Sequence, residues 1–157
     1  MKPVLKGITM TQPNAAADPR PRFHLAFPVD DLAAARAFYG TIMQCEEGRS
    51  SEAWVDFNFY GHQIVAHLAP EECQPVATGG VDGKAVPVRH FGLLMDWTAW
   101  EALAARFEAA GVAFIIEPYV RFKGETGEQG TFFLRDPAGN ALEFKCFRDE
   151  GGIFARG

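Results

Sequence analysis

The chain has 157 residues, which is the size of one ordinary domain and enough to bury a sizeable hydrophobic core. Hydrophobic residues make up 48% of it, and this fraction excludes a wholly disordered chain. A net charge of −5 argues against nucleic acid or an anionic membrane surface as a partner, because such partners require a basic face. No apolar run approaches the roughly 18 residues of a spanning helix, so we expect no membrane partner.

The N-terminal residues 1–21 lack the pattern of a folded segment. Three prolines lie within Pro13–Pro21 with few apolar side chains among them, which predicts a loose arm outside the core. The apolar stretch near the start is interrupted and too short for a signal peptide, and the three cysteines show no zinc-type spacing. We therefore expect a cytoplasmic protein with reduced thiols.

The first structured segment is an alternating stretch over Phe23–Val29, which predicts a half-buried strand. Asp30 or Asp31 then caps an expected helix from about Leu32 to Tyr39. Three short strands are expected after the helix, around residues 43–47, 53–59 and 62–68. The first half of the chain therefore has the order β-α-β-β-β.

The second half repeats this order after a segment rich in proline and glycine. Residues 70–87 show no usable periodicity and are expected to form a linker. A strand over Val88–Met95 follows, and Thr98 with Glu101 has the capping-box spacing of a helix start. We expect this helix to end at Gly111, with three further strands around residues 112–117 or beyond, 130–134 and 141–147 and a C-terminal tail at 149–157.

The repeated order of elements predicts an α+β protein built from two βαβββ modules. The modules span residues 22–69 and 88–148 and belong to one domain over 22–148. When two such modules pair about a pseudo-twofold axis, their curled mixed sheets form an open cup.

Each module has polar side chains on its first and last strands. His24 opens the first module and His67 ends it, while His90 opens the second and Glu143 lies on its last strand. Paired modules would bring these strand faces to one hollow, where imidazole and carboxylate form a nitrogen and oxygen metal site. Two histidines and one carboxylate with open positions suit non-haem Fe(II). The alternative is that each residue is an ordinary strand residue without a metal role.

Five further residues are candidates for contact with a substrate. Tyr60 and His62 flank a turn and could act in acid–base catalysis. Tyr119, Arg121 and Lys123 precede a glycine-rich loop that could close over an anionic substrate. The alternatives are a surface turn and an exposed hairpin.

Residues 31–39, after the first strand, and residues 133–144, near the end, resemble the vicinal oxygen chelate superfamily. That group includes glyoxalase I, extradiol dioxygenases, methylmalonyl-CoA epimerase and proteins of bleomycin or fosfomycin resistance. The resemblance covers about residues 22–148, and its most specific part is the Asp-Pro-x-Gly-Asn-x-x-Glu pattern over 136–143. It implies that His24, His90 and Glu143 are metal ligands. His67 stands where the glyoxalase and epimerase branches have a fourth ligand.

The resemblance implies a metal-dependent enzyme, and we expect an extradiol-type dioxygenase that cleaves the ring of a catechol-like diol with Fe(II). Mn(II), Ni(II), Co(II) and Zn(II) are the other metals considered. A fourth ligand at His67 would leave two open positions and favour a glyoxalase- or epimerase-type isomerase or lyase. The third alternative is a metal-free, drug-binding resistance protein. We also expect a small-molecule substrate and a homodimer, with the site either within one chain or shared between two.

Overall fold

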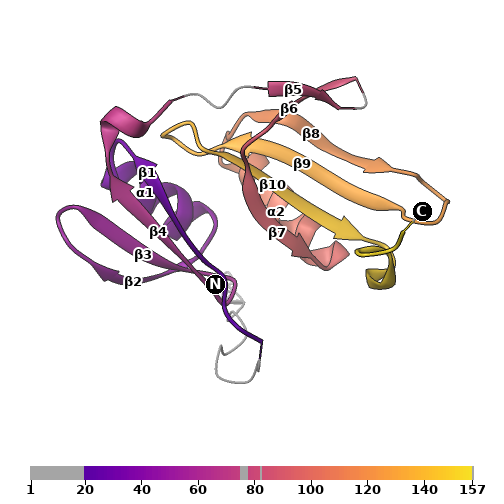
Figure 1. Cartoon of the computed structure of the whole chain (residues 1–157), viewed down its shortest axis with the longest axis horizontal. Helices are drawn as coiled ribbons and strands as arrows, with labels where there is room; N and C mark the ends of the chain where they lie inside the picture. The colour runs from indigo at the N-terminus through magenta and orange to yellow at the C-terminus, as the bar shows by residue number, and fades with distance from the viewer. Residues whose placement is uncertain (1–19, 75–77, 82, 157) are drawn as a thin grey trace, which may run out of the picture.

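Two four-stranded sheets and a separate two-stranded hairpin form the framework of the protein (Figure 1). The structure is a computed structural model, and it describes residues 20–74, 78–81 and 83–156. Nearly all of the predicted arm, residues 1–21, lies outside the described residues.

The first sheet has the strand order β1-β4-β3-β2 and the second the order β7-β10-β9-β8. The elements of the first module are β1 (His24–Val29), α1 (Leu32–Ala35), the π-helical segment η1 (Arg36–Ile42), β2 (Glu46–Ser50), β3 (Trp54–Phe59), β4 (His62–Leu68) and the short 3-10 helix η2 (Pro70–Glu72). Those of the second module are β7 (Phe91–Met95), α2 (Trp97–Ala109), β8 (Phe114–Arg121), β9 (Gln129–Arg135), β10 (Ala141–Phe147) and the 3-10 helix η3 (Glu150–Gly152).

The topology confirms the predicted pair of βαβββ modules. In each module the first strand runs parallel to the last one, as β1 does with β4 and β7 with β10, and the other neighbours are antiparallel. The expected linker, residues 70–87, contains the hairpin of β5 (Thr78–Val81) and β6 (Lys84–Pro87).

Several predicted element boundaries are wrong, and the strand expected over Val88–Met95 begins only at Phe91. The helix after β1 continues to Ile42 because the Met43 amide donates to the Phe38 carbonyl in a π-helical bond, so the next strand starts at Glu46 instead of near residue 43. The cap of α2 is Asp96, whose carboxylate accepts from the amide of Ala99. The predicted capping box at Thr98 and Glu101 therefore does not form.

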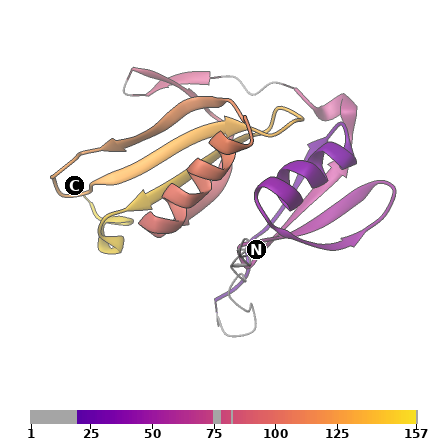
Figure 2. The ribbon, with the colours of Figure 1, turned by 180° about the vertical axis from the view of Figure 1, so that it is seen from behind.

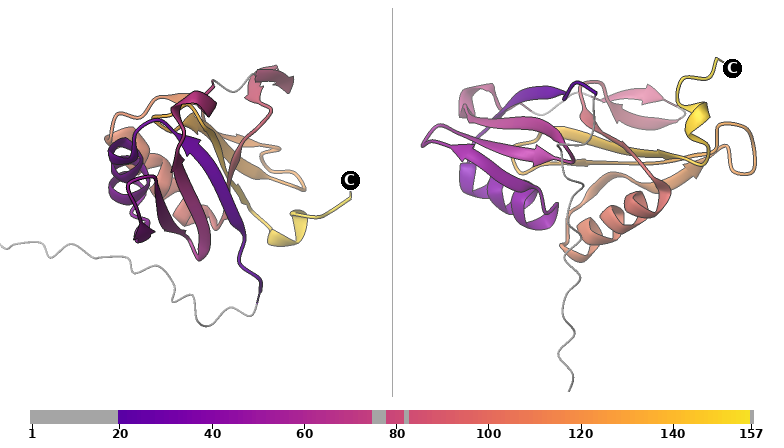
Figure 3. Two further views of the ribbon diagram at one scale, coloured as in Figure 1. Left: turned by 60° about the vertical axis from the view of Figure 1, so that its left-hand side comes forward. Right: turned by 90° about the horizontal axis from the view of Figure 1, so that it is seen from below.

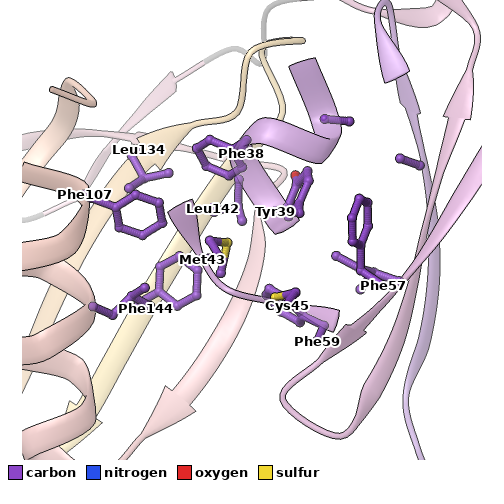
Figure 4. Close-up of a cluster of buried hydrophobic side chains, with 14 of the residues drawn as sticks. Phe38, Tyr39, Met43, Cys45, Phe57, Phe59, Phe107, Leu134, Leu142 and Phe144 are labelled. Carbon is purple, nitrogen blue, oxygen red and sulfur yellow. The ribbon is translucent and has the colours of Figure 1, made fainter. Parts of the chain in front are cut away.

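The core lies between the sheets and the helices and extends through both modules. Figures 2 and 3 show the helices on one side of the two sheets. Side chains of η1 lie between the two modules, and Phe38 stacks on Phe107 of α2 with ring centroids 5.6 Å apart (Figure 4). Among the described residues, no helix covers the opposite faces of the two sheets (Figure 1). The three cysteines are free, and no described helix is long and apolar enough to cross a membrane.

A buried hydrogen bond joins the modules at the turn between β9 and β10. Tyr39, which is 0% exposed, donates from its hydroxyl to Asp136 at 2.7 Å. Asp136 also accepts from the backbone and side-chain amides of Asn140, which in turn donates to the carbonyl of Pro28 in β1. Burial raises the pKa of the Asp136 carboxyl, so its contribution to stability falls as the pH rises through its folded pKa.

Replacing Tyr39 with Phe removes the hydroxyl donor while it keeps the ring. We expect a loss of about 2 kcal/mol in the free energy of unfolding, because a buried carboxylate loses a charged hydrogen bond. Urea unfolding at pH 7 measures this loss. Tyr119→Phe, on the opposite face of the second sheet, is the matched control and should change stability by less than about 0.5 kcal/mol. Equal stabilities of the two variants would contradict the assigned bond.

Candidate functional site

The predicted residues that the structure brings together are His90 and Glu143. His90 directly precedes β7, Glu143 lies on β10, and His90 Nε2 is 2.9 Å from Glu143 Oε2. The neighbours Leu142 and Phe144 point into the core, so Glu143 lies on the sheet face that is turned away from the helices. The hydroxyl of Thr131 donates to the other carboxylate oxygen at 2.7 Å.

The His90 ring is oriented by its backbone contact. Its Nδ1 lies 2.6 Å from the carbonyl oxygen of Pro87, which can only accept, so Nδ1 carries a hydrogen. Nε2 is therefore the nitrogen directed at Glu143, and it is the atom that could bind a metal. The ring of Phe133 meets the imidazole edge-on with centroids 5.1 Å apart.

The close approach of β7 to β10 requires a glycine beside Glu143. The parallel register pairs Gly92 with Glu143, and a Cβ at position 92 would overlap the carbonyl oxygen of Glu143. A side chain there would force the two strands apart and separate His90 from its carboxylate partner.

His24 occupies a similar position in the first module and is oriented by side chains instead of backbone. Its Nδ1 lies 2.7 Å from Gln63 Oε1, and the amide group of Gln63 donates to Asp56 at 3.1 Å. Asp56 is 7% exposed, with Arg49 3.9 Å away. Because the amide nitrogen of Gln63 faces a carboxylate, its oxygen faces His24, whose Nε2 is left to bind a ligand.

His67 does not occupy the strand position that corresponds to Glu143. Leu25 pairs with Ile64 in the first module as Phe91 pairs with Leu142 in the second. The residue after Ile64 is Val65, so Val65 is the counterpart of Glu143, and His67 lies two residues farther along β4 and is exposed.

The histidines of the first module stay apart from the His90–Glu143 pair. Within residues 20–74, 78–81 and 83–156, no three His, Cys, Asp or Glu side chains form a group that could hold a metal. His62 accepts the backbone amide of Phe23 through its Nδ1 at 3.0 Å. Tyr60 lies in the β3–β4 turn with φ 53°, and burial raises the pKa of its hydroxyl.

The remaining candidates lie on or beyond β8. Tyr119 and Arg121 pair with Thr131 and Gln129 and thus share the helix-free face of the second sheet. Lys123 is exposed in the loop that follows β8. An apolar depression of about 310 Å³ lies elsewhere, between η1 and the Asp136 turn, and no predicted site residue lines it.

Sequence reasoning missed the polar residues that orient the histidines and the glutamate. Gln63 of β4 contacts His24 and Thr131 of β9 contacts Glu143, while Asp56 of β3 holds the amide of Gln63, and strand pairing brings these residues together. The pairing of Gln63 with His24 depends on the register of β4 against β1, which the pattern along a single strand does not fix.

Replacing Gly92 with Ala should destabilise the second sheet by about 3 kcal/mol, because a Cβ there overlaps the Glu143 backbone. Thermal or urea unfolding measures the loss. Gly80→Ala in β5, where a Cβ meets nothing within 4 Å, is the control and should change stability by less than about 0.5 kcal/mol. A Gly92→Ala variant as stable as this control would refute the close approach of the strands.

Comparisons with known proteins agree with this architecture. The model of the glyoxalase/bleomycin resistance protein/dioxygenase superfamily matches residues 23–144. A glyoxalase/bleomycin resistance protein/dioxygenase from Alicyclobacillus acidocaldarius is 32% identical, with a TM-score of 0.70 over 88% of this chain and 99% of that one.

Two more distant structures share the fold. The fosfomycin resistance protein FosX from Listeria monocytogenes is 18% identical, with a TM-score of 0.65 over 85% of this chain and 97% of that one. Lactoylglutathione lyase from Agrobacterium tumefaciens is 22% identical, with a TM-score of 0.60 over 88% of this chain and all of that one, 100%. No curated protein matches the chain. The family model covers most of the sequence, and the chain therefore belongs to the glyoxalase/bleomycin resistance protein/dioxygenase superfamily.

Proposed function

We propose that the chain is a metal-dependent enzyme in which His90 and Glu143, with His24 of the partner subunit, hold one divalent ion. The contact of His90 Nε2 with Glu143 Oε2 at 2.9 Å carries this proposal, because it places an imidazole and a carboxylate where one ion can reach both. Two imidazole nitrogens and one carboxylate form a donor set that suits Fe(II) and other first-row divalent metals.

A site shared between two chains follows from where His24 lies. It is exposed on the first sheet, and the described part of the chain contains no group of three ligands. Both sheets have a face without helices, so the first sheet of one chain can cover the second sheet of its partner. A twofold dimer of this kind contains two equivalent sites, each with one histidine from the other chain.

Three protein ligands favour dioxygenase chemistry over isomerase chemistry. Val65 at the counterpart of Glu143 cannot bind a metal, and an octahedral ion with three protein ligands keeps three positions open. A bidentate catechol-like diol and dioxygen together require these three positions. When bound, Fe(II) supplies Lewis acidity toward the diol hydroxyls and an electron source for dioxygen. We therefore propose extradiol-type cleavage of a catechol-like diol.

The residues of this chain would contribute orientation and exclusion of water. Pro87 holds the His90 ring through Nδ1, and Thr131 holds one oxygen of Glu143 so that the other faces His90. The Phe133 ring, 4% exposed, covers one edge of the imidazole. Such fixed neighbours keep the ligands in position before the ion and the substrate arrive.

Metal analysis of anaerobically purified, Fe(II)-loaded protein tests the proposal. We expect close to one iron per chain and oxygen uptake with catechols, and His90→Ala or Glu143→Ala should abolish both. His67→Ala should leave the metal content unchanged. Unchanged metal in His90→Ala, or no metal under any loading condition, would refute the site. A glyoxalase-type enzyme would be favoured instead if the wild type bound Ni(II) or Zn(II) without oxygen uptake and His67→Ala lost this metal.

A mixed dimer tests the sharing of the site between chains. We would purify, with two affinity tags, dimers that contain one His24→Ala chain and one His90→Ala chain. Each variant alone should bind no metal, whereas the mixed dimer regains one intact site. It should therefore bind one ion per dimer, which is half the content of the wild type. A mixed dimer without metal, or a monomeric wild type, would contradict the shared site.

Gln63→Met tests whether Gln63 orients His24. The variant keeps the length of the side chain but removes the acceptor of His24 Nδ1, so we expect metal affinity to fall by about 10- to 100-fold. Competition with a metallochromic indicator measures the affinity. Gln74→Met, at an exposed position, is the control and should bind metal as the wild type does. Equal affinities would exclude a positioning role for Gln63.

A further inference from the structure

We propose that Lys145 and Lys84 form an anion-binding subsite beside the His90–Glu143 pair, so that the substrate of the proposed enzyme carries a carboxylate. The inference rests on the proposed function for the place of the diol. The subsite itself rests on the arrangement of side chains on the helix-free face of the second sheet.

Lys145 lies two residues after Glu143 on β10, so the two side chains share one face of the sheet. Residues two apart on a strand are separated by roughly 7 Å. Across the sheet Lys145 pairs with Thr131, which pairs with Tyr119 of β8. These three residues form a row directly beside the row that contains Glu143.

Lys84 reaches the same row from the β5–β6 hairpin. Its Nζ lies 4.5 Å from the centroid of the Tyr119 ring. Lys84 therefore lies above β8 at one end of the row, and Lys145 projects from β10 at the other end, with its Nζ 5.6 Å from the ring centroid of Phe147. Both side chains are half-buried, so their charges are less screened than those of exposed lysines.

Neither ammonium group is neutralised by a carboxylate within the described ranges. The charged contacts of the two side chains are with aromatic rings, those of Tyr119 for Lys84 and of Phe147 for Lys145. The nearest acid along β10, Glu143, is engaged by His90 and Thr131. Two uncompensated cations on a partly apolar face favour an anionic ligand.

Two cations at the far end of β8, Arg121 and Lys123, lie farther from the metal pair. Arg121 pairs with Gln129, one row beyond Lys145, and its guanidinium group lies 5.0 Å from the ring of the exposed Phe122. Lys123 follows in the exposed loop. The subsite is therefore nearer to the reacting atoms than the loop cations suggested by sequence.

The order of the side chains on this face limits the shape of the substrate. A ligand that reaches both the metal pair and the lysines needs its diol at one end and its anionic group at the other, as in a benzene ring with a carboxylate opposite a vicinal diol. The diol would then face the ligands while the carboxylate faces the lysines. The substrate class is a carboxylated catechol, for which 3,4-dihydroxybenzoate serves as the probe.

Calorimetric titration of the Zn(II)-loaded dimer with catechol and with 3,4-dihydroxybenzoate tests the subsite without turnover. We expect the wild type to bind the carboxylated diol at least about tenfold more tightly, because a carboxylate on an ammonium group forms a charge-assisted hydrogen bond. Lys145→Met and Lys84→Met should each reduce this preference by about tenfold and leave catechol binding unchanged. Arg156→Met, in the exposed C-terminal tail, is the matched control and should retain the preference.

Equal binding of the two diols by the wild type would overturn the subsite. So would a Lys123→Met variant that loses the preference while Lys145→Met keeps it. If the protein binds no metal, the proposed function fails, and titration of the metal-free protein with benzoate then tests the subsite by itself. Benzoate binding that Lys145→Met weakens about tenfold would support the subsite, and binding that is absent or unaffected would overturn it.

Discussion

The buried bond between Tyr39 and Asp136 is the interaction on which the arrangement of the two modules depends. Tyr39 belongs to the helix of the first module, and Asp136 begins the turn before the last strand of the second. Asn140 completes the link, since it binds Asp136 and the Pro28 carbonyl of β1. These contacts place both helices on one side and leave both sheets uncovered on the other, which is where all the candidate ligands lie.

Alternation in the sequence was sufficient to locate strands whose two faces have different environments. β4 and β10 have the predicted bounds, and along β10 buried residues alternate with half-buried ones that face away from the core. The end of the first helix could not be found in this way. It depends on a π-helical bond to Phe38 and on Gln44 with φ 60°, and neither leaves a periodic signal. The hairpin β5–β6 was also missed, because its short strands lie in a segment rich in proline and glycine that shows no periodic pattern.

The site was predicted only as far as residue type and strand position allow. His90 directly precedes β7, Glu143 lies on the strand β10 that pairs with it, and the structure places the two side chains in contact. Whether His67 could be a fourth ligand depended on the register of β4 against β1. That register makes Val65 the counterpart of Glu143 and leaves His67 two residues farther along the strand. Gln63 and Thr131 are ordinary polar residues in sequence, and their importance comes from the neighbours that strand pairing supplies.

The hairpin that joins the modules pairs with neither large sheet, because β5 and β6 form a sheet of their own. Yet in the proposed site it supplies Lys84, whose ammonium group stands over Tyr119. The metal ligands and the residue that recognises the substrate would then lie in different segments, the paired strands and the β5–β6 hairpin, which differ in how firmly the core holds them. The proposed ligands lie on or next to strands held by the core, whereas loops that connect such strands accept insertions or new side chains at little cost in stability. Relatives with the same metal ligands could therefore diverge in substrate through this short segment alone.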